Sequence, residues 1–205
     1  MLKTIEKLTR VLFFLFYCLP ACYAQENNNN QHQVSYCVDP DWMPYEAIRN
    51  SQHVGISADY LEIISKKTNI KFQLIPTSSW QQSLSQVKDG KCDIIAMLNY
   101  SEERASFLSF SDIFFTSGNV LVSRDNMPFL QDLSQTFNYK VGVVPGYRLT
   151  EYIAQYYPEI KTVLVKSELQ GLMALQNKEI DVLLGSMLSI NAHIQQNSLN
   201  NLKIT

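Results

Sequence analysis

A β-strand that runs straight into a polar and aromatic loop is encoded by residues 34–45, VSYCVDPDWMPY. Residues 34–38 favour a strand, and Asp39-Pro40 ends it because proline donates no backbone hydrogen bond to a sheet. The loop that follows carries Trp42 and acidic side chains at the strand exit. Strands of this kind alternate with helices along the rest of the chain, so the sequence predicts an α/β fold.

Helical segments separate the predicted strands. Ser57, Ser79 and Ser167 are the predicted N-caps, and Ser79 forms a capping box with Gln82. The expected strands are 34–38, 70–75, 92–98, 139–144, 162–165 and 180–184, and the expected helices are 57–68, 79–89, 149–156, 167–175 and 186–195.

A strand-like segment at 119–123 divides the chain into two α/β series, and residues 202–205 begin a further element. Two such series joined by a linker predict two lobes with a cleft between them. We place lobe 1 at residues 34–122 and lobe 2 at residues 123–205.

The N-terminus has the composition of a secretory signal peptide, which we place at residues 1–24. It has basic residues, then a short apolar run, then small residues. The run is shorter than the roughly 20 residues of a membrane-spanning helix, although an uncleaved anchor is an alternative. Lipidation at Cys22 is another, because the preceding residues loosely resemble a lipobox. Residues 25–33 lack apolar periodicity and predict a disordered spacer, and we expect the protein in the periplasm.

The composition argues against several classes of function. The chain of 205 residues has a formal net charge of −2 and no basic patch, which argues against a nucleic-acid partner. The three histidines are scattered, and there is no nucleophile elbow, zinc-protease or phosphate-loop motif. We therefore expect no catalytic residue, no metal and no cofactor.

Ligands of open α/β sheets bind in the loops at the carboxyl ends of the strands. The loops after residues 38, 75, 98, 144 and 184 are therefore the candidates, and each carries polar or aromatic side chains. The predicted ligand-binding residues are Asp39, Trp42, Trp80, Asn99, Ser101, Arg104, Tyr147, Arg148 and Ser186.

Trp42 and Trp80 are the only tryptophans of the chain, and both lie at predicted strand exits. A flat indole face offers a small ligand apolar area and a place for a cation. The alternative is that both fill the core beside their loops, but their paired placement favours stacking on a ligand.

Arg104 follows Ser101 at the spacing of a capped helical turn. The free N–H groups of such a turn attract anions, and a guanidinium beside them binds a carboxylate through two hydrogen bonds. An ion pair of Arg104 with Glu102 or Glu103 is the alternative. Arg148 repeats this arrangement in the second half, either as a second positive contact or as a solvated side chain.

Taken together, these segments resemble the family 3 solute-binding proteins, which have the two-lobed type 2 periplasmic-binding fold and carry amino acids and similar small polar ligands. Within that family, segments such as YCVDP and KCDI resemble the sensor modules that precede bacterial histidine kinases and diguanylate cyclases. The resemblance covers nearly all of residues 34–205 and rests on the order and spacing of 39–45, 55–61, 80–96, 101–104, 141–147 and 171–185.

The resemblance implies that Ser101 and Arg104 hold the carboxylate of a ligand that Trp42 and Trp80 sandwich. Amino-acid binders usually place an acidic residue where Ser186 stands, to hold an ammonium group. Because serine carries no charge, we expect a carboxylate-bearing ligand that lacks an α-ammonium.

Cys37 and Cys92 are the cysteines outside the predicted signal peptide. The family's first and third strands are neighbours, so the resemblance implies a disulfide between them, with two buried thiols as the alternative. The family also returns from lobe 2 to pack a last helix on lobe 1, and this chain ends before that return. We expect lobe 1 to expose the apolar surface involved, whether the chain is a fragment or a naturally short protein.

These features predict a monomeric, non-enzymatic protein that binds a small ligand by lobe closure. It would signal through a sensor kinase or cyclase, or deliver the ligand to a membrane transporter. The alternatives are a dehydratase of the cyclohexadienyl type, with Glu46 or Glu102 as acid or base, and the accessory lobe of a lytic transglycosylase.

Overall fold

The first lobe is built on a three-stranded parallel sheet in the order β5-β1-β6. The computed structural model describes residues 32–205, so the predicted signal peptide lies outside the described residues. β1 (Gln33–Cys37) lies between β5 (Lys71–Leu74) and β6 (Ile94–Ile95). Gln33, placed by the sequence in the spacer, is the first residue of β1 and pairs with Lys71.

The third strand is much shorter than the predicted 92–98. Only Ile94 and Ile95 pair with β1, as partners of Tyr36 and Cys37. Immediately before them, the Asp93 carboxylate accepts hydrogen bonds from the backbone N–H and the hydroxyl of Ser35, at 2.7 and 2.6 Å. The backbone N–H of Asp93 also donates to the carbonyl oxygen of Ser35 at 3.0 Å, so side-chain and backbone bonds together hold the start of the strand.

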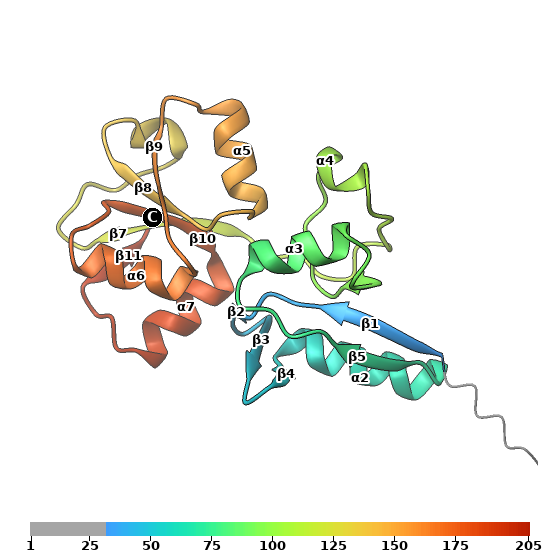
Figure 1. Cartoon of the computed structure of the whole chain (residues 1–205). Helices are drawn as coiled ribbons and strands as arrows, with labels where there is room; N and C mark the ends of the chain where they lie inside the picture. The colour runs from blue at the N-terminus through green and yellow to red at the C-terminus, as the bar shows by residue number, and fades with distance from the viewer. Residues whose placement is uncertain (1–31) are drawn as a thin grey trace, which may run out of the picture. The chain divides into compact units, whose positions relative to one another are not determined.

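Three helices belong to this lobe: α2 (Ile56–Thr68), α3 (Trp80–Lys88) and α4 (Glu102–Ala105) (Figure 1). The predicted cap of α3 is confirmed, because the Ser79 hydroxyl accepts the Gln82 N–H at 3.2 Å. The predicted cap of α2 is wrong. Gly55, not Ser57, precedes the helix, with φ 109°, and a Cβ there would lie 2.7 Å from the Tyr45 carbonyl oxygen.

A small antiparallel sheet at residues 41–54 was not predicted. It consists of β2 (Asp41–Trp42), β3 (Glu46–Arg49) and β4 (Gln52–Val54). Asn50 and Ser51 form the turn between β3 and β4 with φ values of 52° and 62°. Positive φ at both central residues is typical of a hairpin turn whose twist matches the strands.

The second lobe contains a five-stranded sheet in the order β11-β7-β10-β8-β9. The segment predicted as a linker is β7 (Asn119–Arg124), which pairs antiparallel with both β10 and β11. The predicted lobe boundary between residues 122 and 123 thus falls within a strand. The other strands are β8 (Lys140–Val143), β9 (Lys161–Leu164), β10 (Val182–Ser186) and β11 (Leu202–Ile204).

Side chains of β10 point alternately to the two faces of this sheet. Leu183 joins the apolar core that includes Leu172 and Ile190, whereas Val182 and Leu184 join the core that includes Ile153. This alternation is why β10 is a nearly continuous apolar run, since both faces are covered. The covering elements are α5 (Arg148–Tyr156), α6 (Glu168–Gln176), α7 (Met187–Gln196) and a 3-10 turn, η1 (Leu133–Thr136).

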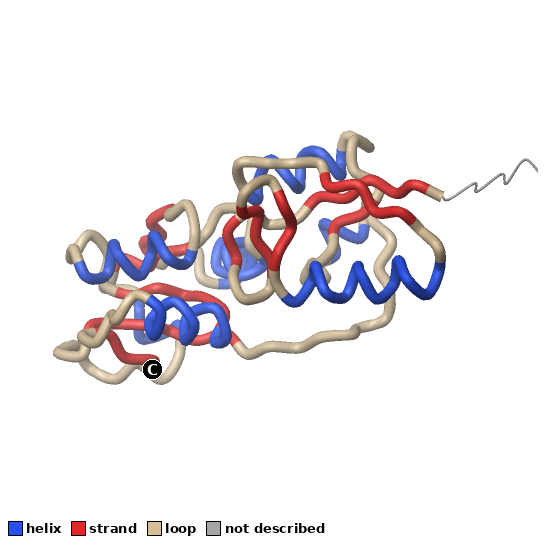
Figure 2. The backbone as a smooth tube through the Cα atoms, turned by 90° about the horizontal axis from the view of Figure 1, so that it is seen from below, coloured by secondary structure: helices blue, strands red, loops and turns tan. Residues whose placement is uncertain are grey.

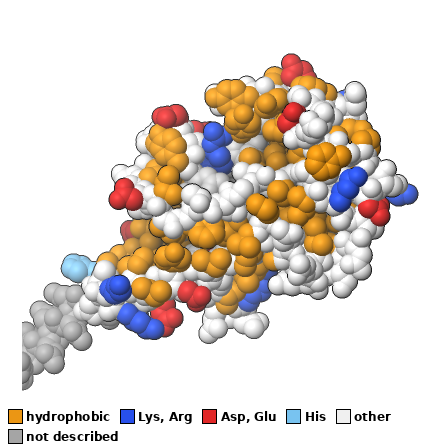
Figure 3. Space-filling view, turned by 180° about the vertical axis from the view of Figure 1, so that it is seen from behind, with side chains coloured by type: hydrophobic (Ala, Val, Ile, Leu, Met, Phe, Trp, Pro, Cys, Tyr) orange, Lys and Arg blue, Asp and Glu red, His pale blue; other side chains and the backbone are white. Residues whose placement is uncertain are grey.

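Residues 106–118 connect α4 to β7 without forming a helix or a strand (Figure 2). Within this connection Phe114 contacts the ring of Tyr60 on α2, with ring centroids 5.2 Å apart. Both rings are exposed, as are Ile63 and Ile64 on α2. The space-filling view shows broad areas of hydrophobic side chains on the face turned away in Figure 1 (Figure 3).

Cys37 and Cys92 form the expected disulfide, with Cα atoms 5.8 Å apart and a sequence separation of 55. The bond joins β1 to the segment before β6, and both cysteines are buried. Between residues 32 and 205, no helix is both long enough and apolar enough to cross a bilayer.

Candidate functional site

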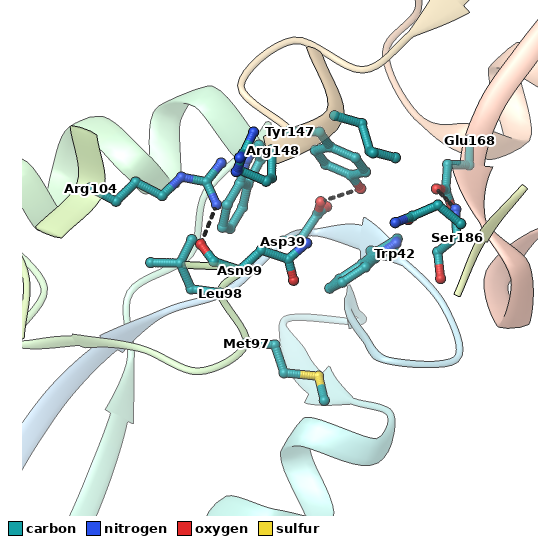
Figure 4. A pocket seen from close by; sticks show the side chains of 13 residues that line it. Asp39, Trp42, Met97, Leu98, Asn99, Arg104, Tyr147, Arg148, Glu168 and Ser186 are labelled. Atoms are coloured by element: carbon teal, nitrogen blue, oxygen red, sulfur yellow. Dashed lines mark hydrogen bonds between the residues drawn. The ribbon is translucent and has the colours of Figure 1, made fainter. Parts of the chain in front are cut away.

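A cavity of about 40 Å³ lies where the loops of the two lobes meet (Figure 4). This space holds only a few water molecules, so the lobes enclose little free volume in this conformation. Among the predicted site residues, Ser101 alone does not line the cavity; its hydroxyl caps α4 by accepting the Arg104 N–H at 3.3 Å. The predicted residues that do line it are Asp39, Trp42, Trp80, Asn99, Arg104, Tyr147, Arg148 and Ser186.

Asp39 follows the carboxyl end of β1 and is almost fully buried. Its Oδ1 accepts the backbone N–H of Asp41 at 2.9 Å, and its Oδ2 accepts the hydroxyl of Tyr147 at 2.6 Å. Burial raises the pKa of Asp39 to about 6, although both hydrogen bonds favour the charged form. A residue of lobe 1 is thereby bonded across the cavity to a residue of lobe 2.

The ring of Tyr147 contacts both tryptophans. Its centroid lies 5.8 Å from that of Trp42 and 6.2 Å from that of Trp80, and both pairs have edge-to-face geometry. In addition, the Trp80 indole donates to the carbonyl oxygen of Gly146 at 2.8 Å. In this conformation Tyr147 therefore contacts Trp42 and Trp80, the two indoles that were predicted to stack on a ligand.

Gly146 allows this close contact between the lobes. Its φ is 77°, and a Cβ on it would lie 3.2 Å from Leu84 and 3.3 Å from the Trp80 ring. Glycine adopts this left-handed conformation without steric cost. The backbone carbonyl of Gly146 can therefore accept hydrogen bonds from lobe 1.

Arg104 is buried, with 3% of its surface exposed. Its guanidinium donates to the Asn99 carbonyl at 2.8 Å, to the Gly146 carbonyl at 2.7 Å and to the Glu151 carboxylate at 2.9 Å. Its Nε has no hydrogen-bond partner. Burial lowers the pKa of Arg104, an effect that the charge of Glu151 opposes. The ion pair of Arg104 is therefore formed across the cleft with Glu151, and not with Glu102 or Glu103 as in the alternative drawn from the sequence.

Arg148 lines the same cavity and begins α5. Its guanidinium lies over the ring of Tyr152, 5.6 Å from the centroid. Such a cation–aromatic contact orients the side chain on the helix surface. Arg148 also lines a second groove, together with Ser101 and Glu151. Arg104 and Arg148, the two arginines predicted as positive contacts, therefore both lie near Glu151.

Two buried carboxyl groups lie near Asp39: Glu46, which the sequence suggests only as an acid or base of the enzyme alternative, and Glu168, which is absent from the predicted site. Glu46, from β3, accepts the Asp39 N–H at 2.7 Å. Glu168, the first residue of α6, lines the cavity and accepts the Ser186 N–H at 2.6 Å. Burial raises the pKa of Glu46 to about 8 and that of Glu168 to about 7. The nearby charge of Asp39 raises both pKa values further.

A signal for Glu168 is present in the sequence. It follows the predicted strand 162–165 by only a few residues, and the carboxyl end of that strand is a ligand-binding position by the same rule that selects the other loops. Ser167 and Glu168 also have the pattern of an ordinary helix start, so this signal does not distinguish a ligand-binding loop from a capped helix.

Ser186 ends β10 and precedes α7. Its hydroxyl lies 2.5 Å from that of Tyr45, which also donates to Ser117 at 2.6 Å. The hydroxyl therefore forms a bond between lobes in addition to lining the cavity. Among residues 32–205, histidine, cysteine and acidic side chains form no group that could hold a metal ion.

The sequence matches the family described as bacterial extracellular solute-binding proteins, family 3, over residues 34–186. It is 23% identical over 162 residues to the virulence sensor protein BvgS of Bordetella pertussis, covering 78% of this chain and only 13% of BvgS. It is 26% identical over 162 residues to a probable histidine-binding protein of Campylobacter jejuni, covering 77% of this chain and 61% of that protein.

The fold is similar to that of solved binding proteins. An ancestral arginine-binding protein bound to arginine superposes with a TM-score of 0.76 and 20% identity, covering 84% of this chain and 78% of the other. This likeness confirms the predicted two-lobed α/β fold. The chain belongs to family 3 of the bacterial extracellular solute-binding proteins.

Proposed function

We propose that this protein recognises a small polar ligand with a carboxylate group, in the cleft between its lobes and outside the cytoplasm. The observation that carries the proposal is the environment of Arg104. Its buried guanidinium bonds two oxygen atoms of lobe 2, one of them a carboxylate oxygen of Glu151. A ligand carboxylate that enters the opened cleft would offer acceptors of the same chemistry.

Opening of the cleft is supported by the nature of the contacts across it. The polar ones are hydrogen bonds from Trp80, Arg104 and Tyr147, the Arg104–Glu151 ion pair and the Tyr45–Ser186 contact, and the apolar ones include the ring contacts of Tyr147 with Trp42 and Trp80. A few polar contacts exchange readily with water or with a ligand. Closure on the ligand then shifts the open–closed equilibrium, which is the output of the protein.

The output has two candidate recipients, a sensor kinase or cyclase and a membrane transporter. The matched relatives include a sensor protein and a probable histidine-binding protein. In both roles we propose a monomer that recognises its ligand through Trp42, Trp80, Asn99, Arg104 and the facing residues Tyr147, Arg148 and Ser186.

A ligand screen tests this proposal. Thermal unfolding is measured with each of the twenty amino acids, simple carboxylates and polyamines, and isothermal titration calorimetry follows for each compound that raises the Tm. We expect a carboxylate-bearing compound to bind, and Arg104→Gln to weaken it at least about tenfold. Lys66→Gln, a loss of charge at an exposed site of α2, is the control. Equal affinity in Arg104→Gln and the control would contradict the proposal.

An acid–base enzyme is the second candidate, and one observation favours it: Asp39 and Glu168 line the cavity with raised pKa values. Carboxyl groups with pKa values near neutrality can exchange protons with a substrate. That candidate requires a bound compound to be consumed. We expect mass spectrometry to recover it unchanged after prolonged incubation.

A further inference from the structure

The first turn of α5 presents one side of the helix to lobe 1. Tyr147 is the N-cap of this helix and Glu151 lies four positions further on, so the two side chains share a face. Ile153 lies on the other side and is buried in the core of lobe 2. The helix is thus anchored in lobe 2 by one face, while Tyr147 and Glu151 reach their hydrogen-bond partners in lobe 1.

The identity of Tyr147 is not explained by the helix that it begins. N-caps are usually Ser, Thr, Asp or Asn, whose side chains accept an N–H of the first turn, and Tyr147 makes no such bond. Its hydroxyl instead donates to Oδ2 of Asp39 in lobe 1 (Figure 4). Removal from water raises the pKa of Tyr147 well above its ordinary value of 10, so the hydroxyl remains a donor at neutral pH.

Tyr147 and Glu151 occupy the positions that the sequence assigns to a ligand. The predicted ligand lies between Trp42 and Trp80 and holds its carboxylate against Arg104. In this conformation the Tyr147 ring contacts both indoles, and the Glu151 carboxylate accepts from Arg104 at 2.9 Å. An aromatic ring with a hydrogen-bond donor and a carboxylate therefore already occupy the site, and both are supplied by lobe 2.

Both groups leave lobe 1 together when the cleft opens, because both belong to α5. The Asp39 carboxyl, which is 4% exposed, then lacks its tyrosine donor, and Arg104 lacks its carboxylate partner. A polar group that loses its partner costs free energy until water or a ligand replaces that partner. A compound that supplies a ring, a donor and a carboxylate restores all three contacts at once. A site that bonds a ligand hydroxyl also discriminates against analogues that lack it.

We propose that the ligand is an aromatic carboxylate whose ring carries a hydrogen-bond donor, such as a (4-hydroxyphenyl)alkanoate, and that it replaces Tyr147 and Glu151 at their partners in lobe 1. The ring lies between the two tryptophans, its hydroxyl donates to Asp39, and the carboxylate accepts from Arg104. The inference rests on the proposed function, because it assumes that a carboxylate binds Arg104 in this cleft. Tyr147 takes part in recognition as the group that the ligand replaces.

A series of related compounds tests the ligand class. Calorimetry compares 4-hydroxybenzoate, (4-hydroxyphenyl)acetate and 3-(4-hydroxyphenyl)propanoate, which differ in the spacing between ring and carboxylate. The best of them is compared with its analogue without the hydroxyl, with p-cresol, which lacks the carboxylate, and with hexanoate, which lacks the ring. We expect each omission to weaken binding about tenfold or more. Trp42 and Trp80 are the only tryptophans of the chain, so a change in their fluorescence reports entry of the ring between them.

Tyr147→Ala tests the replacement. The change removes the phenol ring, so the ligand no longer competes with a side chain for the indoles and for Asp39. We expect the hydroxyphenyl compounds to bind this variant about tenfold more tightly than the wild-type protein. Tyr156→Ala, the same change at an exposed position of α5, is the control and should bind them as the wild-type protein does. Circular dichroism checks the fold of both variants, and the wild-type series decides the ligand class if Tyr147→Ala does not fold.

The outcomes separate the two proposals. If simple carboxylates bind through Arg104 as tightly as the hydroxyphenyl compounds do, the inference is overturned and the proposed function stands. Equal affinity of Tyr147→Ala and its control also overturns the replacement. If p-cresol binds as tightly as the hydroxyphenyl carboxylates, and Arg104→Gln changes neither, the proposed function fails and the replacement of Tyr147 stands. If no compound of the series binds either the wild-type protein or Tyr147→Ala, the inference is overturned, and the amino acids and simple carboxylates of the thermal screen then decide the proposed function.

Discussion

The hydroxyl group of Tyr147 donates a hydrogen bond to Oδ2 of Asp39 at 2.6 Å, and 108 residues of chain separate the two. The bond joins the loop after β1 in lobe 1 to the start of α5 in lobe 2. It is one of few polar contacts that hold the cleft closed around a cavity of about 40 Å³. The same residues line that cavity, so closure and recognition depend on the same side chains.

Tyr147→Phe should favour the open form of the protein. The change removes the hydroxyl and leaves the buried Asp39 carboxyl without that donor, which costs roughly 1–3 kcal/mol of the closed state. Small-angle X-ray scattering should report a larger radius of gyration without ligand. Tyr156→Phe, on the exposed side of α5, serves as the control. Identical scattering of both variants would show that the bond does not hold the lobes together.

Glu151→Gln should strengthen the binding of a carboxylate ligand, because Glu151 competes for the guanidinium of Arg104. Without the charge of Glu151, the terminal nitrogen of Arg104 that now donates to it becomes available to a ligand carboxylate. We expect affinity for the ligand to rise roughly threefold to tenfold. Calorimetry with the best compound of the screen measures it. Glu62→Gln breaks an exposed ion pair with Lys66 and should leave affinity unchanged. Weaker binding in Glu151→Gln would contradict the competition.

Stability should fall as the pH rises from 6.5 to 8.5, because Glu46 keeps a proton in the folded state. Burial raises its pKa from an ordinary 4.5 to about 8, so above pH 4.5 the unfolded state releases a proton that the folded state retains. The stabilisation is present below the unfolded pKa and is lost as the pH passes the folded pKa. Glu168, whose pKa is raised to about 7, contributes with the same sign in the lower part of this range, whereas the contribution of Asp39, whose pKa is raised to about 6, is lost mainly below pH 6.5.

The pH range avoids the opposite effect of His53, which faces Glu46 at 4.0 Å. Burial lowers the pKa of His53 to about 4, so this residue reduces stability only as the pH falls below its ordinary value of 6.5. We expect the Tm to drop by roughly 5 °C or more between pH 6.5 and 8.5, and by less in Glu46→Gln. An unchanged pH profile in that variant would rule out Glu46 as the source.

Loss of the disulfide should destabilise lobe 1. The double substitution Cys37→Ser and Cys92→Ser, or reduction of the bond, removes a cross-link between residues 55 positions apart. The unfolded chain gains freedom, which lowers the free energy of unfolding by roughly 2–4 kcal/mol. Urea unfolding measures the change. Peptide mapping without reductant should recover the peptides of Cys37 and Cys92 as one linked species. Alkylation of both thiols before reduction would disprove the bond.

Local patterns were predicted where neighbouring residues decide the structure. Ser79 and Ser167 cap α3 and α6 as expected, since a cap needs only a hydroxyl and the N–H groups three residues away. The hairpin at 41–54 was missed, because its strands are short and its turn residues, Asn50 and Ser51, lack the glycine that marks such turns.

The sequence by itself determined the α/β order, the caps of α3 and α6 and the loops that carry polar side chains, because these depend on residues close together in the chain. Only the tertiary structure decided that Arg104 pairs with Glu151, 47 residues away, and that Tyr147 meets both tryptophans. It also brought Glu168 to Ser186 and left one carboxyl oxygen buried without a partner. Burial and pairing between residues far apart in the chain decide which side chains of the site carry a charge, and both depend on the folded structure.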